Sequence, residues 1–490
     1  MKKLKMPLTK KNKIYIGKKR SSYPLFLTVK EDNINKQKLE TILEDMLSTG
    51  GDFAEIFIED KKTTVFSFVN QILDSYQVGF SNGLGLRLAK DNNVYYTATN
   101  DFSAKNIKDV VASLKKNISG KKVCNYITLE RIKRYKCKSV SHYTNEDLKD
   151  LFKSLDSKIR NMDERINQVS IVLQNVLQNV TIARENGDYK NEDRIRSRIY
   201  ITVSFKDKDK SCSVTYSHGM TSNFDFLDEI NFDEEIEMLV KDGIDKLYAK
   251  PCIGGKMPVI IENGFGGVIF HEACGHAMEA TSVAEGISVL SHDLGKKIAN
   301  EKVSIIDDGT LKNEWGSTKI DDEGCETRVN KLIENGVLKG YLIDEINNRK
   351  MNMKPTGSSR RESYLYAPTS RMNNTYLVNG TDTFEDMIKD IKLGLYAKKM
   401  GGGSVSPETG DFNFACDLAY MIRDGKLAEC VKSASLIGNC KEILARVDMV
   451  GDNLALGQGM CGSISGSVPV NVGMPRIRVS EILVGGEKSE

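Results

Sequence analysis

The sequence predicts an α+β protein of two domains: an N-terminal mixed α/β module and a β-rich C-terminal domain that carries a helix with two closely spaced histidines. In the first half, helical patterns alternate with long β-prone runs, whereas in the second half glycine separates many short apolar runs. A chain of 490 residues is long enough for about two to four domains. We place the boundary at Pro251, so that the domains cover residues 35–250 and 251–490.

The elements of the first domain follow from hydrophobic periodicity. An amphipathic pattern predicts a helix over residues 35–48. Alternating apolar and polar residues then predict strands over 54–59, 65–69, 84–89 and 94–98. Charged helical patterns follow over residues 105–116 and 145–160.

Two apolar, β-branched runs come next and predict long antiparallel strands over residues 169–182 and 195–205. The second run ends at the charged pentapeptide 206–210, which is typical of a solvated turn. A helix over 232–246 leads to the boundary at Pro251. In the second domain we expect a strand over 259–262 and a helix over 266–280, followed by short strands.

The first twenty residues form a basic extension. They contain eight Lys and one Arg but no acidic residue, so the rest of the chain is mildly acidic although the net charge is +3. Such a segment can bind nucleic acid or an anionic surface. A solvated, flexible extension over residues 1–34 is the favoured interpretation, and we expect no nucleic-acid partner.

Composition indicates a soluble cytoplasmic protein. The sequence has no apolar run long enough to cross a membrane and no secretory signal at its N-terminus, so neither a membrane span nor export is expected. Its ten cysteines are scattered without close pairing. In a chain of this size that pattern is typical of reduced thiols in a cytosol rather than of a disulfide framework.

The strongest functional signal is the hexapeptide from His271 to His276, which has the pattern His-Glu-x-x-x-His. Two of the five histidines flank a carboxylate here, as in zinc hydrolases. Imidazoles hold Zn²⁺ while one coordination position stays open for water. Glu272, directly after the candidate ligand His271, is suited to act as the general base for that water.

The spacing of the two histidines is unusual. Zinc peptidases mostly have histidines four residues apart, on one face of a helix. A separation of five turns the two side chains roughly 140° apart on a regular α-helix. One π-type turn, or a helix that ends near Gly275, would bring them together.

A third ligand must come from elsewhere, and Cys461 between two glycines is the best candidate. Glycine on both sides permits a sharp turn and a close backbone approach. The alternative is that Cys461 is a small buried apolar residue, as free cysteines usually are. We interpret Cys274, inside the motif, as inert helix packing.

The segment Phe270 to His276 resembles the signature of the TldD/PmbA family of metallopeptidases, once described as modulators of DNA gyrase. Further blocks similar to the family keep their order through the second half: residues 303–310, 320–324, 332–341, 360–364, 368–376, 401–403 and 484–486. The resemblance implies His271, His276 and Cys461 as Zn²⁺ ligands and Glu272 as the catalytic base. The segment 278–293 is less similar, which leaves local substrate contacts open.

The resemblance also implies a dimer. The family pairs a subunit that bears the motif with a related PmbA/TldE-type subunit that lacks it, and this chain looks like the catalytic TldD-type member. The partner is expected to be that subunit or a second copy of the chain. The implied activity is hydrolysis of short or unfolded peptides, as in leader-peptide trimming or degradation of labile antitoxins. Long β-prone segments suit binding of an extended peptide as an added strand.

Three residues are weaker candidates for substrate binding. Arg360, Arg361 and Tyr364 offer guanidinium and phenol donors for an oxyanion or a peptide carboxylate, with structural ion pairs as the equal alternative. Two other functions stay open for the chain as a whole. One is a peptide-binding or regulatory subunit with a structural zinc, and the other is a zinc amidase acting on a non-peptide substrate.

Overall fold

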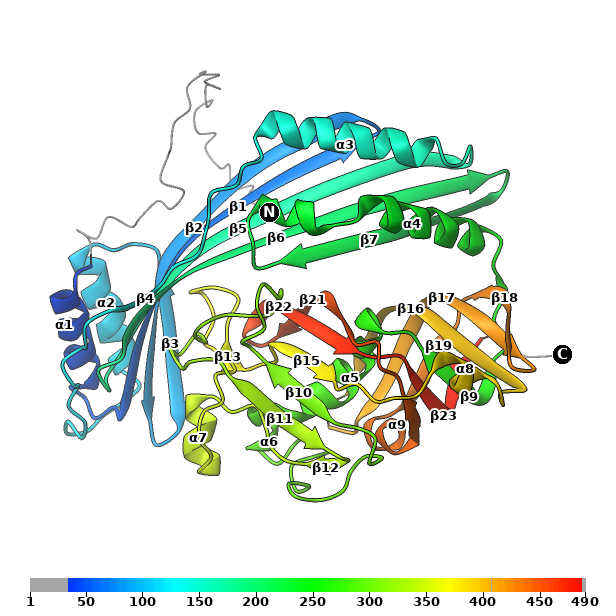
Figure 1. Cartoon of the computed structure of the whole chain (residues 1–490). Helices are drawn as coiled ribbons and strands as arrows, with labels where there is room; N and C mark the ends of the chain where they lie inside the picture. Colours follow the sequence, from blue (N-terminus) through cyan, green and yellow to red (C-terminus); the bar gives the residue numbers. More distant parts are fainter. Residues whose placement is uncertain (1–33, 407, 487–490) are drawn as a thin grey trace, which may run out of the picture.

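The computed structural model describes residues 34–406 and 408–486. The predicted basic extension therefore lies, except for its last residue, outside the described residues. The strand-rich α+β class is confirmed, and two large bodies of structure are visible, a long arched sheet and a more compact β-rich half beneath it (Figure 1). Among the described residues, no helix combines the length and the apolar character that a membrane crossing requires.

The first half of the chain builds the long sheet, whose main strands are antiparallel. Its central neighbours are, in order, β3 (Asn93–Thr99), β2 (Ile72–Lys90), β1 (Phe53–Val69), β5 (Ile166–Arg184) and β6 (Tyr189–Asp207). Two further strands pair with β6, namely β7 (Lys210–Met220) and the short β4 (Lys133–Tyr135). The turn between β6 and β7 lies at the charged pentapeptide, as predicted.

Four helices cover parts of this sheet, and all four were predicted from periodicity. α1 (Lys36–Leu47) and α2 (Ala104–Lys115) share an apolar cluster with the start of β1 and the end of β2. α3 (Asn145–Arg160) and α4 (Phe232–Leu247) share another with β5, β6 and β7. In Figure 1 these two pairs lie at opposite parts of the arch.

The predicted strands over 54–59 and 65–69 form one strand in the structure. Residues 60–64 are polar and break the alternation, yet β1 pairs continuously with β2 on one side and β5 on the other. Because both neighbours satisfy its backbone, β1 stays extended through the polar stretch. The hairpin to β2 turns at Asn70 and Gln71, which both have positive φ (52° and 67°), as a two-residue turn between twisted strands requires.

The second half contains two main sheets. One is an eight-stranded sheet in which the pairing of β16 with β17 closes a ring of five strands. Its strands are β8 (Lys250–Pro251), β9 (Gly255–Ile261), β16 (Leu393–Val405), β17 (Asp411–Arg423), β18 (Lys426–Lys432), β19 (Ser435–Asn439), β20 (Val447–Val450) and β23 (Ile477–Gly485).

The other is a six-stranded sheet that ends in β21 as an edge strand. Its strands are β10 (Ile305–Asp308), β11 (Val329–Glu334), β12 (Val337–Leu338), β15 (Asn374–Leu377), β21 (Ala455–Ser463) and β22 (Gly466–Met474). Besides the helix of the histidine motif, this half contains a separate two-stranded ladder and further short helices: β13 (Ser359–Arg360), β14 (Thr369–Ser370), α6 (Ala280–Val283), α7 (Glu345–Met351), α8 (Phe384–Ile388) and α9 (Cys440–Arg446).

Buried ion pairs join the two halves. Arg87 of β2 donates to Glu55 of β1 at 2.7 Å and to Glu323 of the second half at 2.5 Å. The same Glu55 accepts from Arg361 at 2.5 Å. All four side chains are at most about 2% exposed. Charges buried this deeply must be paired, so these contacts fix how the long sheet sits on the β-rich half.

The predicted motif helix exists, but it is a composite. A 3₁₀ turn over Gly264–Gly267 precedes α5 (Val268–Phe270), and the π-turn and 3₁₀ turn that follow carry the chain to Met278. The apolar residues Val268, Ile269 and Phe270 are buried in the large core of the second half, as predicted.

Replacing Gly267 by alanine should destabilise the protein. A Cβ at this position would lie 2.5 Å from the backbone nitrogen of Gly473 in β22, and backbone cannot move aside as a flexible side chain can. We expect a loss of about 1–3 kcal/mol in the free energy of unfolding, measured by denaturant titration. Gly402→Ala is the matched control, because a Cβ there meets nothing within 4 Å. Equal stability of the two variants would contradict the prediction.

Candidate metal centre

A π-turn brings the two histidines of the motif together. Residues His271–Gly275 form this turn, in which the backbone N–H of His276 donates to the carbonyl of His271, five residues earlier. The two rings lie 5.2 Å apart between centroids, at 82° to one another. The structure thus adopts the local correction that the five-residue spacing requires, and such turns are concentrated at functional sites.

Gly275 allows the turn to pack tightly. A Cβ on Gly275 would lie 2.2 Å from the sulfur of Met372, which is fully buried beneath the turn. The motif glycine is therefore required by close packing, and its φ is an ordinary helical −58°.

Cys461 of β21 joins the two histidines from the other end of the chain. The potential ligand atoms of His271, His276 and Cys461 all lie within 4.8 Å of one another, and Cys461 Sγ is 3.3 Å from His276 Nε2. Ligand atoms around one tetrahedral zinc ion are about 3.3–3.8 Å apart. The three side chains that the sequence singled out therefore come together in a geometry close to that of a bound ion.

The polar groups of this cluster also fit a cation. His271 is 2% exposed, and neither of its ring nitrogens has a hydrogen-bond partner among the described residues. A buried imidazole without partners costs free energy unless something binds it. Two imidazoles and one thiol form a donor set typical of zinc.

Electrostatics hold Cys461 as a thiolate. Burial raises the pKa of its thiol, but His271 and His276 lower it further, to about 4. For His276, burial lowers the pKa while Glu279 and Cys461 raise it, with a net result well above the usual value. Thiol and imidazole thus shift each other's pKa in the direction that favours their charged forms, and binding of a metal ion would compete with protons for these groups.

Glu279 and Arg371 support the cluster and were not identified from the sequence. Glu279 Oε2 lies 3.0 Å from His276 Nδ1, which leaves Nε2 directed at Cys461. Arg371 lies 3.8 Å from Glu279 Oε1 and donates to the carbonyl of Cys461. Carboxylates in this position orient ligating histidines and raise their basicity. The spacing of three residues between His276 and Glu279 was the available signal.

Replacing Glu279 by glutamine should weaken metal binding. The amide keeps the size of the side chain but loses the charge beside His276 Nδ1. We expect about 10-fold weaker zinc affinity, at the low end of what such partners contribute, measured by competition with a chelator. Glu285→Gln, whose carboxylate pairs with Lys350, is the control. Unchanged affinity in Glu279→Gln would show that Glu279 does not support the ligand.

Glu272 lies beside the cluster without joining it. Its Oε2 is 3.5 Å from His276 Nε2, and its side chain is 27% exposed, in contrast to the buried His271. The metal-ligating cluster of the described residues comprises the two histidines and the cysteine only. Glu272 is therefore close enough to contact a water at the cluster and remains open to solvent.

The weaker candidates occupy other positions. Arg361 is buried in the ion pair with Glu55 and also donates to the carbonyl of Asp322. Tyr364 is 7% exposed and packs in an apolar cluster with Phe57 of the long sheet. Both side chains help to join the two halves, which matches the alternative of a structural role for Arg361, and substrate binding by Arg361 and Tyr364 stays a prediction. Arg360 has no such partner and lines a small pocket.

Cys274 is confirmed as a buried packing residue. Its sulfur lies 3.3 Å from that of Cys440 in α9. Burial, and after it the neighbouring Cys440, raises the pKa of the Cys274 thiol well above its usual value. Its side chain is fully buried.

Comparisons with known proteins show which family the chain resembles. Sequence models of the PmbA/TldA metallopeptidase family match domain 1 over residues 54–118, the central domain over 138–249 and the C-terminal domain over 254–486. The metalloprotease TldD homolog of Buchnera aphidicola subsp. Acyrthosiphon pisum is 30% identical over 470 residues, which cover 93% of this chain and 97% of the relative.

A more distant relative and a solved structure extend the likeness. The zinc metalloprotease TldD homolog of Saccharolobus solfataricus is 27% identical and covers 83% of this chain and 91% of its own. The crystal structure of TldE from Thermococcus kodakarensis is 18% identical and has the same fold, with a TM-score of 0.71 over 92% of this chain and 99% of that one. The chain therefore belongs to the PmbA/TldD family of metallopeptidases.

Proposed function

We propose that this protein is a zinc-dependent peptidase that hydrolyses short or unfolded peptides, with Glu272 as the general base. The observation that carries the proposal is the convergence of His271, His276 and Cys461 beside a carboxylate that does not join them. The name of the Saccharolobus relative, a zinc metalloprotease, supports the choice of metal. So does the donor set of two imidazoles and a thiolate.

The residues of the chain divide the chemistry among them. When bound, zinc supplies a Lewis acid that polarises the scissile carbonyl and lowers the pKa of a water to about 7. Glu272 accepts the proton of the attacking water and then passes it to the leaving amine. Glu279 holds the proton on Nδ1 of His276, so that Nε2 keeps its lone pair for the metal.

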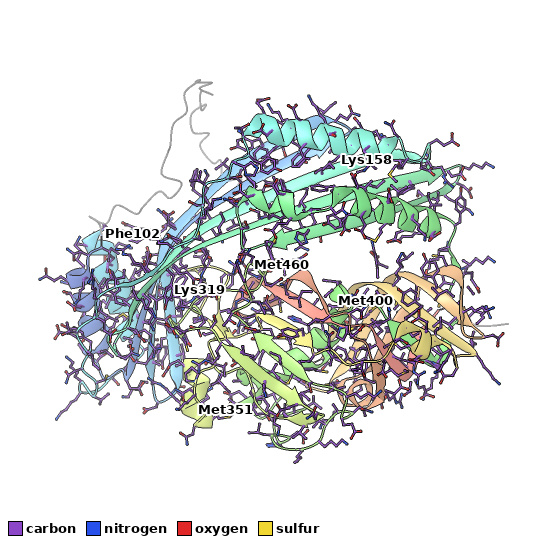
Figure 2. All side chains as sticks on the ribbon, viewed as in Figure 1. Phe102, Lys158, Lys319, Met351, Met400 and Met460 are labelled. Atoms are coloured by element: carbon purple, nitrogen blue, oxygen red, sulfur yellow. The ribbon has the colours of Figure 1, made fainter. Side chains whose placement is uncertain are left out.

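An extended peptide fits the edge of the sheet that carries Cys461. β21 is an edge strand of the six-stranded sheet, and it lies on the side of the second half that faces the long sheet (Figure 1). Met460, next to Cys461, is 52% exposed there (Figure 2). The carbonyls of Gln458, Gly459 and Cys461 already accept from Arg198, Trp315 and Arg371. A substrate added as a strand would therefore bond to the remaining backbone groups of this edge, with little dependence on sequence.

The test compares the same peptide sequence in an unstructured form and inside a folded domain. We expect the zinc-loaded protein to cleave an unstructured peptide and to leave the same sequence uncut inside a folded domain, with product followed by mass spectrometry. Each assay is run with and without the motif-less TldE-type subunit. Absence of cleavage in every combination, with zinc bound, would support a regulatory subunit with a structural metal. Cleavage of non-peptide amides alone would support an amidase.

We also propose that the protein works as a dimer, through the edge of β2. β3 pairs only with Leu84–Lys90 of β2, so the outer edge of β2 before Leu84 has no partner strand among the described residues. Ile72, Tyr76, Val78 and Phe80 on this segment are 39–69% exposed. Tyr76, Val78 and Phe80 share one face, since they lie opposite Phe66, Thr64 and Lys62 of β1, whereas Ile72 lies opposite Val69 beyond a β-bulge and points to the other face. A long apolar edge of this kind invites pairing with another chain.

Replacing Phe80 by lysine should disrupt this association. A charge on the exposed edge opposes strand pairing, so the variant should sediment as a monomer at concentrations where the parent is a dimer. Val123→Lys is the control, because Val123 is 68% exposed but lies outside the sheet. An unchanged sedimentation coefficient for Phe80→Lys, in both homo- and hetero-mixtures, would place the interface elsewhere.

A further inference from the structure

A row of buried arginines lies where the long sheet meets the second half. Arg194, Arg196 and Arg198 alternate along β6, so their side chains share one face, and each is 7–8% exposed. All three donate to backbone carbonyls of the second half: Arg194 to Ile320, Arg196 to Trp315 and Ser317, and Arg198 to Gln458. These bonds hold the guanidinium groups in fixed positions.

Three buried guanidinium groups in this region, those of Arg196, Arg198 and Arg360, form no ion pair with a carboxylate among the described residues, and Arg198 lies instead over the rings of Tyr200 and Trp315. Arg194 pairs with Glu192 at 2.9 Å and with Asp322 at 2.6 Å. Neither Arg196 nor Arg360 has an acidic group within 4.0 Å among the described residues, and the hydrogen bonds of Arg360 reach only the carbonyl of Met372. Burial, and after it the positive charges of Arg360 and Arg194, lowers the pKa of Arg196 to about 9. Buried charges are normally paired, so the guanidinium groups of Arg196 and Arg360 lack an anion at ion-pair distance.

Both arginines line one small pocket of about 40 Å³ between the two halves. Gln178, Thr318 and Ser467 contribute polar groups to its wall. One water-sized group needs about 10–15 Å³, so the space suits a group of about three heavy atoms. A carboxylate has this size, and paired guanidinium groups are its preferred partners.

The acidic residues in the pocket wall already have donors. Asp322 accepts from Arg194 and from the backbone N–H of Arg361. Glu362 accepts from the backbone N–H of Ser467. Asp321 accepts from three backbone N–H groups, of Ser359, Glu323 and Cys325. Asp322 attracts both Arg196 and Arg360 at longer range, but among the described residues no carboxylate forms an ion pair with either arginine within 4.0 Å.

The pocket lies next to the metal cluster. Val468 of its wall is directly opposite Cys461 in the β21–β22 ladder, and the two side chains pack together in one apolar cluster. Such opposite residues have Cβ atoms about 4.5–5.5 Å apart. On the other side, Arg360 donates to the carbonyl of Met372, whose sulfur packs on Gly275 of the π-turn. One layer of side chains thus separates the pocket from the cluster.

We propose that this pocket, built around Arg196 and Arg360, binds a carboxylate of the peptide substrate within about one or two residues of the scissile bond. An extended residue spans about 3.3–3.6 Å, which sets this range. The carboxylate is the C-terminus of the peptide or an Asp or Glu side chain. The inference rests on the proposed peptidase function and adds which part of the substrate the pocket binds.

Binding and cleavage are measured separately. Zinc-loaded Glu272→Gln protein is titrated with three fluorescent peptides of one sequence: a free C-terminus, an amidated C-terminus, and an amidated peptide carrying one Asp near the cleavage position. We expect one of the two carboxylate peptides to bind about 10- to 100-fold more tightly than the neutral one, as hydrogen bonds to a charged group contribute. The tighter peptide identifies the source of the carboxylate.

Substitution of the two arginines tests whether the pocket causes the preference for a carboxylate. Arg360→Gln and Arg196→Gln, each added to Glu272→Gln, should abolish the preference for the carboxylate peptide and leave the affinity for the neutral one unchanged. Lys312→Gln is the control, because it removes an exposed positive charge from the neighbouring loop. Circular dichroism checks folding. If both arginine variants fail to fold, competition by formate against the carboxylate peptide on the parent protein replaces them, and it should act on that peptide alone.

The outcomes separate the two proposals. Equal affinity for all three peptides, or a preference that survives both arginine substitutions, overturns the carboxylate pocket. Absence of competition by formate does the same where the variants are unfolded. Carboxylate-dependent binding without cleavage by the native protein overturns the peptidase and keeps the pocket. Cleavage without any carboxylate preference overturns the pocket and keeps the peptidase.

Discussion

Replacing Glu272 by glutamine should lower kcat for peptide hydrolysis by about 10²- to 10⁴-fold while zinc stays bound, because general acid–base catalysis contributes that much. Glu272 is outside the cluster of His271, His276 and Cys461 and is partly exposed. In the proposed mechanism its loss therefore removes the proton acceptor and leaves the three proposed ligands in place. Glutamine keeps the shape of the side chain. KM should change little, because the substrate gains its binding energy elsewhere.

The measurement requires zinc content and kinetics on the same preparation. Glu285→Gln serves as the control for the substitution itself, since that carboxylate is half-exposed and pairs with Lys350 on the surface. Full activity in Glu272→Gln would remove this residue from the mechanism. Loss of zinc together with activity would instead make Glu272 a ligand, and the division between ligands and base would be wrong.

Much of the metal cluster could be predicted because its chemistry is local. His271, Glu272 and His276 lie within six residues, and the geometry of a helix alone required a π-turn at this spacing. Cys461 is 185 residues from His276. Its flanking glycines suggested a turn, whereas it lies inside the regular strand β21. Its assignment depended mainly on the family resemblance.

Of the two supporting residues, Glu279 lies only three residues from His276, whereas Arg371 could not be predicted because its partners are distant in sequence. Arg371 contacts Glu279, Cys461 and Ser465, which only the folded chain brings together. The alternating arginines of β6 follow the pattern of a strand with one polar face, which on its own indicates exposure to solvent. In the structure that face is covered by the second half, so the same pattern marks a buried interface.

The prediction of the first half succeeded where the hydrophobic periodicity was strong and failed at the polar residues 60–64. All four helices from α1 to α4 follow amphipathic patterns. The predicted division of β1 into two strands was wrong, because pairing with β2 and β5 keeps residues 60–64 extended although they are polar. In the second half, closure of the ring by β16 and β17 depends on strands more than one hundred residues from β9, which no local pattern reveals.

Replacing Cys461 by serine should abolish activity, because Cys461 is the third of the proposed zinc ligands. A serine hydroxyl binds zinc poorly compared with the Cys461 thiol, whose pKa the two neighbouring imidazoles lower. Loss of a residue that supports a ligand, such as Glu279, is expected to lower zinc affinity about 10- to 100-fold. Loss of Cys461 should lower it by more than that. Chelator competition measures the affinity, and peptide cleavage at saturating zinc measures the residual activity.

Cobalt(II) in place of zinc tests the sulfur directly. A thiolate ligand gives cobalt a charge-transfer absorption that nitrogen and oxygen ligands do not, so the parent protein should show this band and Cys461→Ser should lack it. Cys430→Ser is the control, because Cys430 lies on β18, outside the metal-ligating cluster. If Cys461→Ser kept both the band and the zinc affinity, another sulfur would have to be the ligand, and the only cysteine within the motif is Cys274. Because that thiol is fully buried against Cys440 with a raised pKa, this result would require the π-turn to refold, and the arrangement of the site described here would be wrong.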